Sequence, residues 1–281
     1  MRRDTGLPSA DAADDFQRAR RRQVLARLRG WLRGEPDDVS MMLPFDEVVA
    51  ALGIEGERSL GVQTIPLDSI VGSVDRGGDF DRRFRPTSNR ARERWERIDE
   101  AQRRGESMPP IDVYRVGDLH FVRDGHHRVS VAFALGYKVI EAHVTEIQTR
   151  LPAAGISLRG DLTTKSYERI FRDRAPLPGE MAELITVDDP WNFAELAENM
   201  EAWGFRLIQD VGEYIDRREV ARRWFEEEYE PVVGMLKEAE LIGSGTQAEA
   251  YLRFARERYR LIRSHEWNEE VIERLRHPKK N

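Results

Sequence analysis

The residues best suited to chemistry lie in one short stretch, Asp-Gly-His-His-Arg at positions 124–128. An alternating run over 111–116, a Gly-Asp pair and a second run over 119–122 come before it, which predicts a β-hairpin. An apolar run over 129–135 follows and ends at Gly136, which predicts a helix with a glycine C-cap. The stretch therefore lies where a strand ends and a helix begins, and the backbone N–H groups at such a helix end favour an anion.

The side chains of this stretch fit an anion site. Gly125 lets a ligand approach the backbone closely, and Arg128 can hold a phosphate or a carboxylate with two hydrogen bonds. Of His126 and His127, we expect one to hold the turn through hydrogen bonds and the other to face the ligand. Asp124 is explained by a helix N-cap, but a carboxylate beside bound phosphate also needs a cation, and Mg²⁺ held by Asp124 would supply it.

The chain before the hairpin adds candidate residues. The glycine-containing loop at 72–78 lacks the lysine and the directly following helix of a P-loop, so we expect a mobile loop beside the site. Arg82, Arg83 and Arg85 come next, and they either reach a phosphate or form a solvated charged surface. Four of the six histidines fall between positions 120 and 143, but their spacing fits no zinc-binding pattern.

The order of these features resembles the ParB/sulfiredoxin superfamily over roughly residues 61–148. Five features carry the resemblance. They are an Ile-Pro-Leu opening at 65–67, two prolines before the hairpin at 109–110, the box at 124–128, an apolar helix with its glycine at 129–136 and a closing strand at 139–147. It implies an α+β fold with a small mixed sheet and helices packed on it. It also implies a nucleoside triphosphate, ATP or CTP, whose phosphates lie at the box.

The branches of this superfamily differ in activity, so a shared fold does not fix the function. In the sulfiredoxins a cysteine takes the position of His126, and this chain has no cysteine, which excludes sulfinic-acid reduction by that route. The DNA-segregation CTPases carry Gly-Glu-Arg-Arg at the box and a DNA-reading helical domain after it, and the sequence shows neither pattern. The free-serine kinases carry an acidic residue before their box, as Asp124 does here, and a glutamate base after the first strand, for which Asp75 is the nearest candidate.

Three functions follow from these residues. The first is a nucleotide-binding protein in which residues 125–128 hold the triphosphate, acting as a switch or weak NTPase linked to self-association or to DNA. The second is a Mg²⁺-dependent phosphotransferase for a small hydroxylated substrate, with Asp75 or Asp124 as the catalytic base. The third is a DNA-binding protein or nuclease that uses the arginine-rich front half. We prefer the first.

Composition and charge limit the class of protein. The chain has 281 residues, of which 40% are hydrophobic and 34% charged, as expected of a globular protein. No apolar run reaches the length of a membrane span, and the start lacks the apolar core of a signal peptide, so we expect a cytoplasmic protein. Residues 1–34 carry nine arginines against four aspartates, and residues 76–104 carry ten against six acidic residues, so both could contact DNA; residues 183–240 carry sixteen acidic and six basic residues and would repel it.

We expect three parts: a basic helical extension at 1–60, a ParB/sulfiredoxin-like domain at 61–150 and an acidic helical domain at 151–281 that mediates homo-oligomer formation. An unstructured lead-in to about residue 14 should precede an amphipathic helix over 16–33. That helix either packs on its own domain, which we prefer, or binds nucleic acid or an anionic membrane.

The expected elements follow from periodicity. Strands are predicted near 62–68, 111–116, 119–123 and 139–147, and helices near 44–52, 88–104, 126–135, 193–203, 214–225, 229–239 and 247–275. The segment 157–179 is predicted to be a connector. Gly-Ser-Gly at 243–245 is interpreted as a helix C-cap followed by an N-cap, because a helix, not a strand, precedes it.

Overall fold

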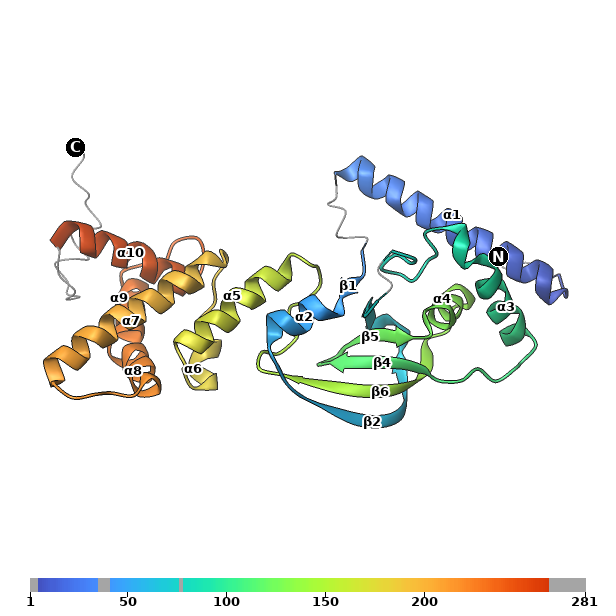
Figure 1. The fold of residues 1–281 in the computed structure, drawn as a ribbon. Coiled ribbons are helices and arrows are strands. Elements are labelled where there is room, and N and C mark those ends of the chain that lie inside the picture. The colour runs from blue at the N-terminus through green and yellow to red at the C-terminus, as the bar shows by residue number, and fades with distance from the viewer. Residues whose placement is uncertain (1–4, 35–40, 76–77, 263–281) are drawn as a thin grey trace. The chain divides into compact units, whose positions relative to one another are not determined.

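The computed structural model describes residues 5–34, 41–75 and 78–262 (Figure 1). The chain divides into two compact units, residues 1–165 and 166–281. The first unit contains a mixed sheet with helices packed on it, which confirms the predicted α+β fold class. Of the predicted elements, the part of the last helix beyond residue 262 lies outside the described residues. No helix in the described ranges is long and apolar enough to cross a membrane.

The sheet of the first unit has six strands in the order β1-β3-β5-β4-β6-β2. Their bounds are β1 Leu43–Pro44, β2 Ile54–Pro66, β3 Ile70–Ser73, β4 Ile111–Val116, β5 Leu119–Asp124 and β6 Val139–Thr149. β4 and β5 form the predicted antiparallel hairpin, and β3 runs parallel to β5. β4 runs parallel to β6, and β2 closes the edge antiparallel to β6.

Two strand predictions are corrected. β2 begins at Ile54 rather than near residue 62, because its backbone pairs with β6 from Ile54 to Pro66 although its first half is polar and exposed, as an edge strand permits. β3 occupies the start of the predicted glycine loop. Gly72 is needed there for close packing, since an added Cβ would lie 2.2 Å from the Leu43 carbonyl oxygen. Residues 76–77 of that loop lie outside the described residues.

Four helices pack on this sheet: α1 Pro8–Arg33, α2 Phe45–Leu52, α3 Arg92–Arg103 and α4 His126–Leu135. Phe121 and Val122 are neighbours in β5, so they point to opposite faces of the sheet. Val122 belongs to the buried cluster that includes Phe16 of α1 and Trp95 of α3, whereas Phe121 belongs to the cluster built on α2. Helices α1, α3 and α4 therefore share one face, and α2 covers the other (Figure 1).

The predicted lead-in without structure is wrong from residue 8 onward, because α1 begins at Pro8. Proline suits the first turn of a helix, where no N–H partner is lost. The Asp11 carboxylate accepts hydrogen bonds from both the backbone N–H and the hydroxyl of Thr5, which fixes the entry to the helix. Leu151 and Leu162 follow the predicted end of the central domain, yet they are buried in the α2 cluster of the first unit.

The remaining elements are helical: α5 Asp161–Arg174, α6 Gly179–Glu183, α7 Trp191–Val211, α8 Arg217–Trp224, a π-helical turn at Phe225–Tyr229, α9 Glu230–Glu238 and α10 Gln247–Ile262. The predicted connector at 157–179 is wrong, because α5 fills most of it; Phe171 is buried in the core of the second unit. The C-cap part of the interpretation of 243–245 is wrong, because α9 ends at Glu238 with Ala239 as its C-cap, and the cap at the start of α10 comes from Thr246. Thr246 and Glu249 exchange side chain-to-backbone hydrogen bonds at the start of α10, as in a capping box.

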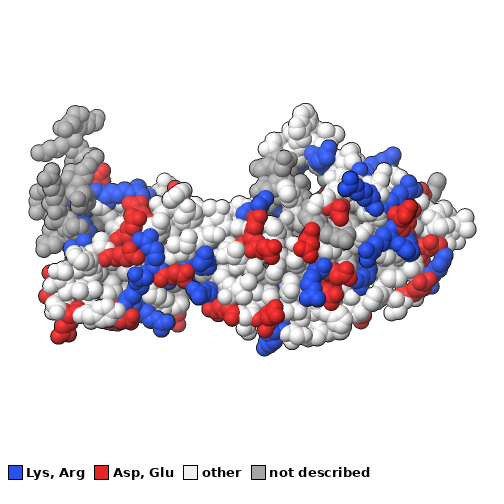
Figure 2. All heavy atoms as spheres, in the orientation of Figure 1, with Lys and Arg blue, Asp and Glu red and all other residues white. Residues whose placement is uncertain are grey.

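Several acidic residues of the second unit are paired with arginines. Glu201 pairs with Arg174 and Glu228 with Arg258, and both arginines lie outside the acidic segment 183–240. Within it, Glu227 pairs with Arg223. Acidic and basic side chains accordingly alternate on the face shown in Figure 2. On that face the net negative charge of this segment forms no continuous acidic surface.

Candidate functional site

The turn between β5 and α4 depends on Gly125. This residue is the N-cap of α4 and has φ +100°, in the left-handed region that glycine adopts without strain. A Cβ at this position would lie 2.5 Å from Cγ2 of Ile111, so the turn also lacks space for a side chain. Gly125 was predicted to let a ligand approach the backbone; in the structure the group that lies where a Cβ would be is the side chain of Ile111, the first residue of β4.

Both histidines of the box are buried. His126 and His127 are 4% and 7% exposed. Nε2 of His126 lies 2.6 Å from the hydroxyl oxygen of Ser73, which ties the start of α4 to the end of β3. The ring of His127 meets Phe80 edge-on at 5.3 Å between centroids. His126 therefore holds the turn as expected, and the described contacts of His127 are also with the protein's own core.

Arg128 is held by three oxygen atoms of the same unit. Its guanidinium donates to the carbonyl oxygens of Pro109 and Pro110 at 2.5 and 2.7 Å, and to Oδ2 of Asp124 at 2.7 Å. The Arg128 side chain is 13% exposed and that of Asp124 is 59% exposed. Asp124 is not the helix N-cap, because Gly125 takes that position and the Asp124 carboxylate pairs with Arg128 instead.

A small hollow of about 20 Å³ lies at this helix end. Besides residues 124–128, it is lined by Arg94 and Ile98 of α3. Arg94 is exposed and makes no ion pair with any described residue, so it can turn toward an anion at the hollow. The helix over 88–104 was predicted, but Arg94 was not among the predicted site residues. A signal was present, because Arg94 and Ile98 are four positions apart and share one helix face.

Asp75 lies at the same edge of the sheet as Asp124. β3 and β5 are parallel with Ser73 opposite Val122, so the residues two positions further on leave neighbouring strands at the same end. Asp75 is exposed. Within 5–34, 41–75 and 78–262, no group of three or more His, Cys, Asp or Glu residues is arranged to hold a metal ion. A cation at this edge would need most of its ligands from a bound phosphate and water.

The other predicted phosphate ligands lie elsewhere. Arg83 lines a separate hollow of about 400 Å³ between α1, the 83–85 loop and α4, together with Arg18, Arg22 and Arg85. Arg82 lines neither this hollow nor the one at the box. The structure therefore brings residues 124–128 together, adds Arg94, places Asp75 on the same sheet edge and leaves Arg82 and Arg83 outside the group.

Known proteins offer a limited comparison. No model of a protein family matches the chain, and no curated protein matches it. Among solved structures it is similar to sulfiredoxin from Arabidopsis thaliana, with 20% identity and a TM-score of 0.24 over 30% of this chain and 82% of that one. It is also similar to two structures of a pNOB8-like ParB N-domain. One has 9% identity and a TM-score of 0.25 over 80% of this chain and 87% of that one. The other has 11% identity and a TM-score of 0.23 over 74% and 78%.

Proposed function

We propose that this chain binds a nucleoside triphosphate, ATP or CTP, whose phosphates lie at the turn between β5 and α4. We further propose that phosphate binding at this turn acts as a switch. The observation that carries the proposal is the unequal exposure of the Arg128 ion pair, 13% for the guanidinium and 59% for the Asp124 carboxylate. A partly buried guanidinium held by an exposed carboxylate is a pair in which the anion can be exchanged.

The energetics favour such an exchange. An ion pair with one well-exposed partner contributes about 0–1 kcal/mol, so releasing Asp124 costs little. A phosphate in its place gains charge-assisted hydrogen bonds from Arg128, the positive end of the α4 dipole and access to Arg94. The released carboxylate becomes one oxygen ligand for Mg²⁺, with the remaining ligands supplied by phosphate and water.

Because the hollow is small, a phosphate and the Asp124 carboxylate cannot occupy it together, and the exchange between them gives two distinct states. A volume of about 20 Å³ holds about one water molecule, so a phosphate enters only when the Asp124 side chain moves out. Arg128 also holds the carbonyl oxygens of Pro109 and Pro110, so a change at its guanidinium is transmitted to the segment that leads into β4. Self-association or DNA binding is the output that such a switch would control, with slow hydrolysis as its reset.

A thermal-shift panel of ATP, ADP, CTP and GTP, with and without Mg²⁺, tests the proposal. A triphosphate at 100 times its dissociation constant should stabilise the protein by about 2.7 kcal/mol. Arg94→Ala should weaken the shift without altering the unliganded protein, because Arg94 is exposed and unpaired within the described residues. Arg90→Ala, an exposed arginine outside the hollow, is the matched control. Absence of any shift in the wild type would refute the proposal.

A phosphotransferase is the second candidate, and the shared sheet edge of Asp75 and Asp124 favours it. Asp75, two residues beyond the end of β3, would act as the base toward an acceptor hydroxyl placed over phosphates at α4. Nucleotide consumption that requires an added hydroxylated substrate and is lost in Asp75→Asn would support this candidate. Consumption that is independent of such a substrate would support the switch.

A further inference from the structure

Helix α1 changes its surroundings halfway along its length. Six residues of its first sixteen are buried, namely Asp11, Ala12, Asp15, Phe16, Ala19 and Gln23. In this half Phe16 meets Trp95 of α3 at 5.6 Å between ring centroids. No described residue of α1 after Gln23 is buried. The preferred prediction, that this helix packs on its own domain, therefore holds for the first half only.

The second half exposes an apolar stripe. Five large apolar side chains are 50%, 47%, 50%, 76% and 68% exposed: Val24, Leu25, Leu28, Trp31 and Leu32. Their spacing places them on one face of the helix. At 100° per residue, that face lies roughly 180° around the helix axis from the face buried in the first half. The stripe therefore points away from the side that α1 packs on and is no continuation of the core.

Arginines border this stripe on both sides. Residues 16–34 contain seven arginines and no acidic residue, at positions 18, 20, 21, 22, 27, 29 and 33. At helical spacing, Arg27 lies along one border of the stripe and Arg29 along the other. Arg27 and Arg29 are exposed and make no ion pair with any described residue. An apolar face between basic borders is the surface pattern of a helix that lies in a membrane interface.

The geometry points to an anionic lipid surface as the partner of residues 24–33, with α1 lying flat and the stripe inserted among the acyl chains. A lipid surface satisfies both halves of the pattern, since the stripe enters hydrocarbon and the arginines meet phosphate groups. A second copy docked through the same face would bring like charges together. Nucleic acid would bind the arginines but leave the stripe in water. Helix α1 does not span the bilayer, because no described helix is long and apolar enough.

Vesicle flotation of the full chain tests this proposal with bilayers of phosphatidylcholine alone and of phosphatidylcholine mixed with phosphatidylserine. Binding is expected only to the anionic vesicles and should weaken with salt. The double variant Leu28→Glu, Leu32→Glu should abolish it. Arg27→Gln and Arg29→Gln should each lower the partition coefficient about fivefold. Insertion should shift the tryptophan emission to shorter wavelength, and the Trp31→Phe variant should lose that shift.

A matched control carries the same change of charge elsewhere. Phe205 and Val211 of α7 are exposed apolar residues, at 66% and 49%. The variant Phe205→Glu, Val211→Glu should bind vesicles as the wild type does, and circular dichroism should show that both double variants remain folded. Three results would overturn the proposal: no binding to anionic vesicles, equal loss in the control, or self-association without vesicles that the Leu28→Glu, Leu32→Glu variant abolishes.

Discussion

The guanidinium of Arg128 donates a 2.7 Å hydrogen bond to the carboxylate of Asp124, four residues earlier and across the N-terminal end of α4. The two residues that the sequence assigned separately to phosphate and to metal are thus each other's partners. The carboxylate of Asp124 occupies the position beside Arg128 where a bound anion is expected. Without nucleotide, the guanidinium is therefore already paired with an anion of the protein itself. This pairing makes the effects of substitution at Asp124 depend on the cation.

Substitution of Asp124 by asparagine should therefore change nucleotide affinity in opposite directions. Without Mg²⁺, the variant removes both a competitor for Arg128 and a like charge beside the phosphate, so affinity should rise. With Mg²⁺, it removes a carboxylate ligand of the cation, so affinity should fall relative to the wild type. Isothermal titration with and without Mg²⁺ measures both signs. Affinity that is unchanged in both conditions would place the phosphates away from Asp124.

Gly125→Ala should destabilise the first unit by about 2–4 kcal/mol. The variant adds the strain of φ +100° for a residue with a Cβ and a contact at 2.5 Å to Ile111. Gly136 at the other end of α4 is the matched control, since its φ is +81° but nothing lies within 4 Å of an added Cβ. Gly136→Ala should cost about 1 kcal/mol. Equal losses in urea denaturation would show that contact with Ile111 adds nothing to backbone strain.

The sequence was sufficient for the local elements around the site and insufficient for its partners. The β4–β5 hairpin and α4 were predicted with nearly correct bounds, because alternation, helical periodicity and glycine stops act over a few residues. The hydrogen bonds from Arg128 to Pro109 and Pro110 join residues 19 and 18 positions apart, which no local pattern encodes. The resemblance to a superfamily implied a phosphate ligand at this turn, whereas the structure shows the carboxylate of Asp124 paired with Arg128 there.

Edges and surfaces were harder to predict for a related reason. The first half of β2 forms through backbone pairing with β6, and its polar side chains carry no periodic signal. In α1 the buried face of the first half and the exposed apolar stripe of the second half lie on opposite sides of the helix, and which of them meets the core is set by packing. Arg94 was not predicted, because the sequence of α3 has the pattern of an ordinary amphipathic helix. Tertiary packing sets the position of Arg94 beside residues 124–128.

His120 should make the first unit sensitive to acid. Burial, and then the positive charge of Arg115, lower the pKa of His120 from 6.5 to about 4. Below about pH 6.5 the His120 imidazole is protonated in the unfolded chain but stays neutral in the folded protein. The free energy of unfolding therefore falls as the pH drops toward 4. The full effect is about 3 kcal/mol for a side chain that is only 6% exposed.

Denaturation by urea between pH 7 and pH 4 measures this loss. Carboxylates titrate in the same range, so the comparison is between variants. His120→Leu should flatten the pH dependence by about 3 kcal/mol, whereas His143→Gln, at an exposed position in β6, should leave it unchanged. If His120→Leu retains the wild-type slope, the imidazole is protonated in the folded state.

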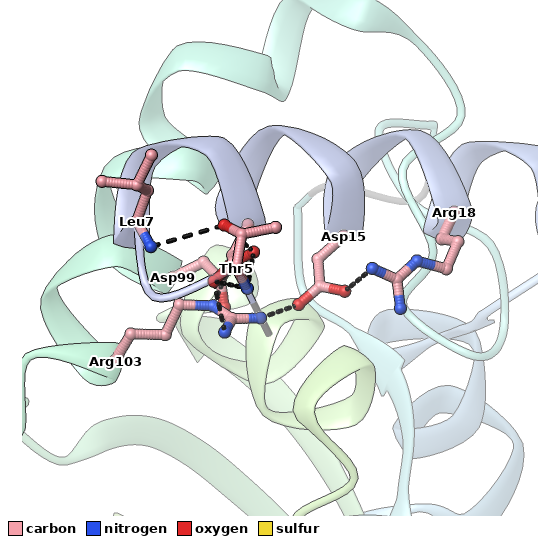
Figure 3. Close-up of polar contacts among 7 residues, drawn as sticks. Thr5, Leu7, Asp15, Arg18, Asp99 and Arg103 are labelled. Atoms are coloured by element: carbon pink, nitrogen blue, oxygen red, sulfur yellow. Dashed lines mark hydrogen bonds and ion pairs between the residues drawn. The ribbon is translucent and has the colours of Figure 1, made fainter. Parts of the chain in front are cut away.

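Among the arginines, substitution of Arg103 should most weaken the packing of α1 against α3. Its guanidinium bonds Asp99 at 3.1 Å, lies 3.7 Å from Asp11 and also pairs with Asp15, and all three carboxylates are almost wholly buried (Figure 3 shows Asp99, Asp15 and Arg103). Burial lowers the pKa of Arg103, but the hydrogen bonds that its guanidinium donates to Asp99 and Asp15 outweigh burial and raise the pKa overall. Arg103 is therefore charged in the folded protein. Without it, Asp11 and Asp99 each lose an ion-pair partner, whereas Asp15 keeps its pair with Arg18 at 3.0 Å.

Arg103→Met should cost about 3–5 kcal/mol, as expected when one partner of a buried ion pair is removed. Arg104→Met is the control, because the neighbouring arginine is 56% exposed and its pair with Glu100 contributes about 0–1 kcal/mol. Hydrogen exchange should show early opening of α1 in the first variant and not in the second. The triple variant Arg103→Met, Asp15→Asn, Asp99→Asn should recover part of the loss, because it also removes the charges of two carboxylates that pair with Arg103. If Arg103→Met alone is as stable as the wild type, α1 is held by Phe16 and its apolar neighbours rather than by this ion network.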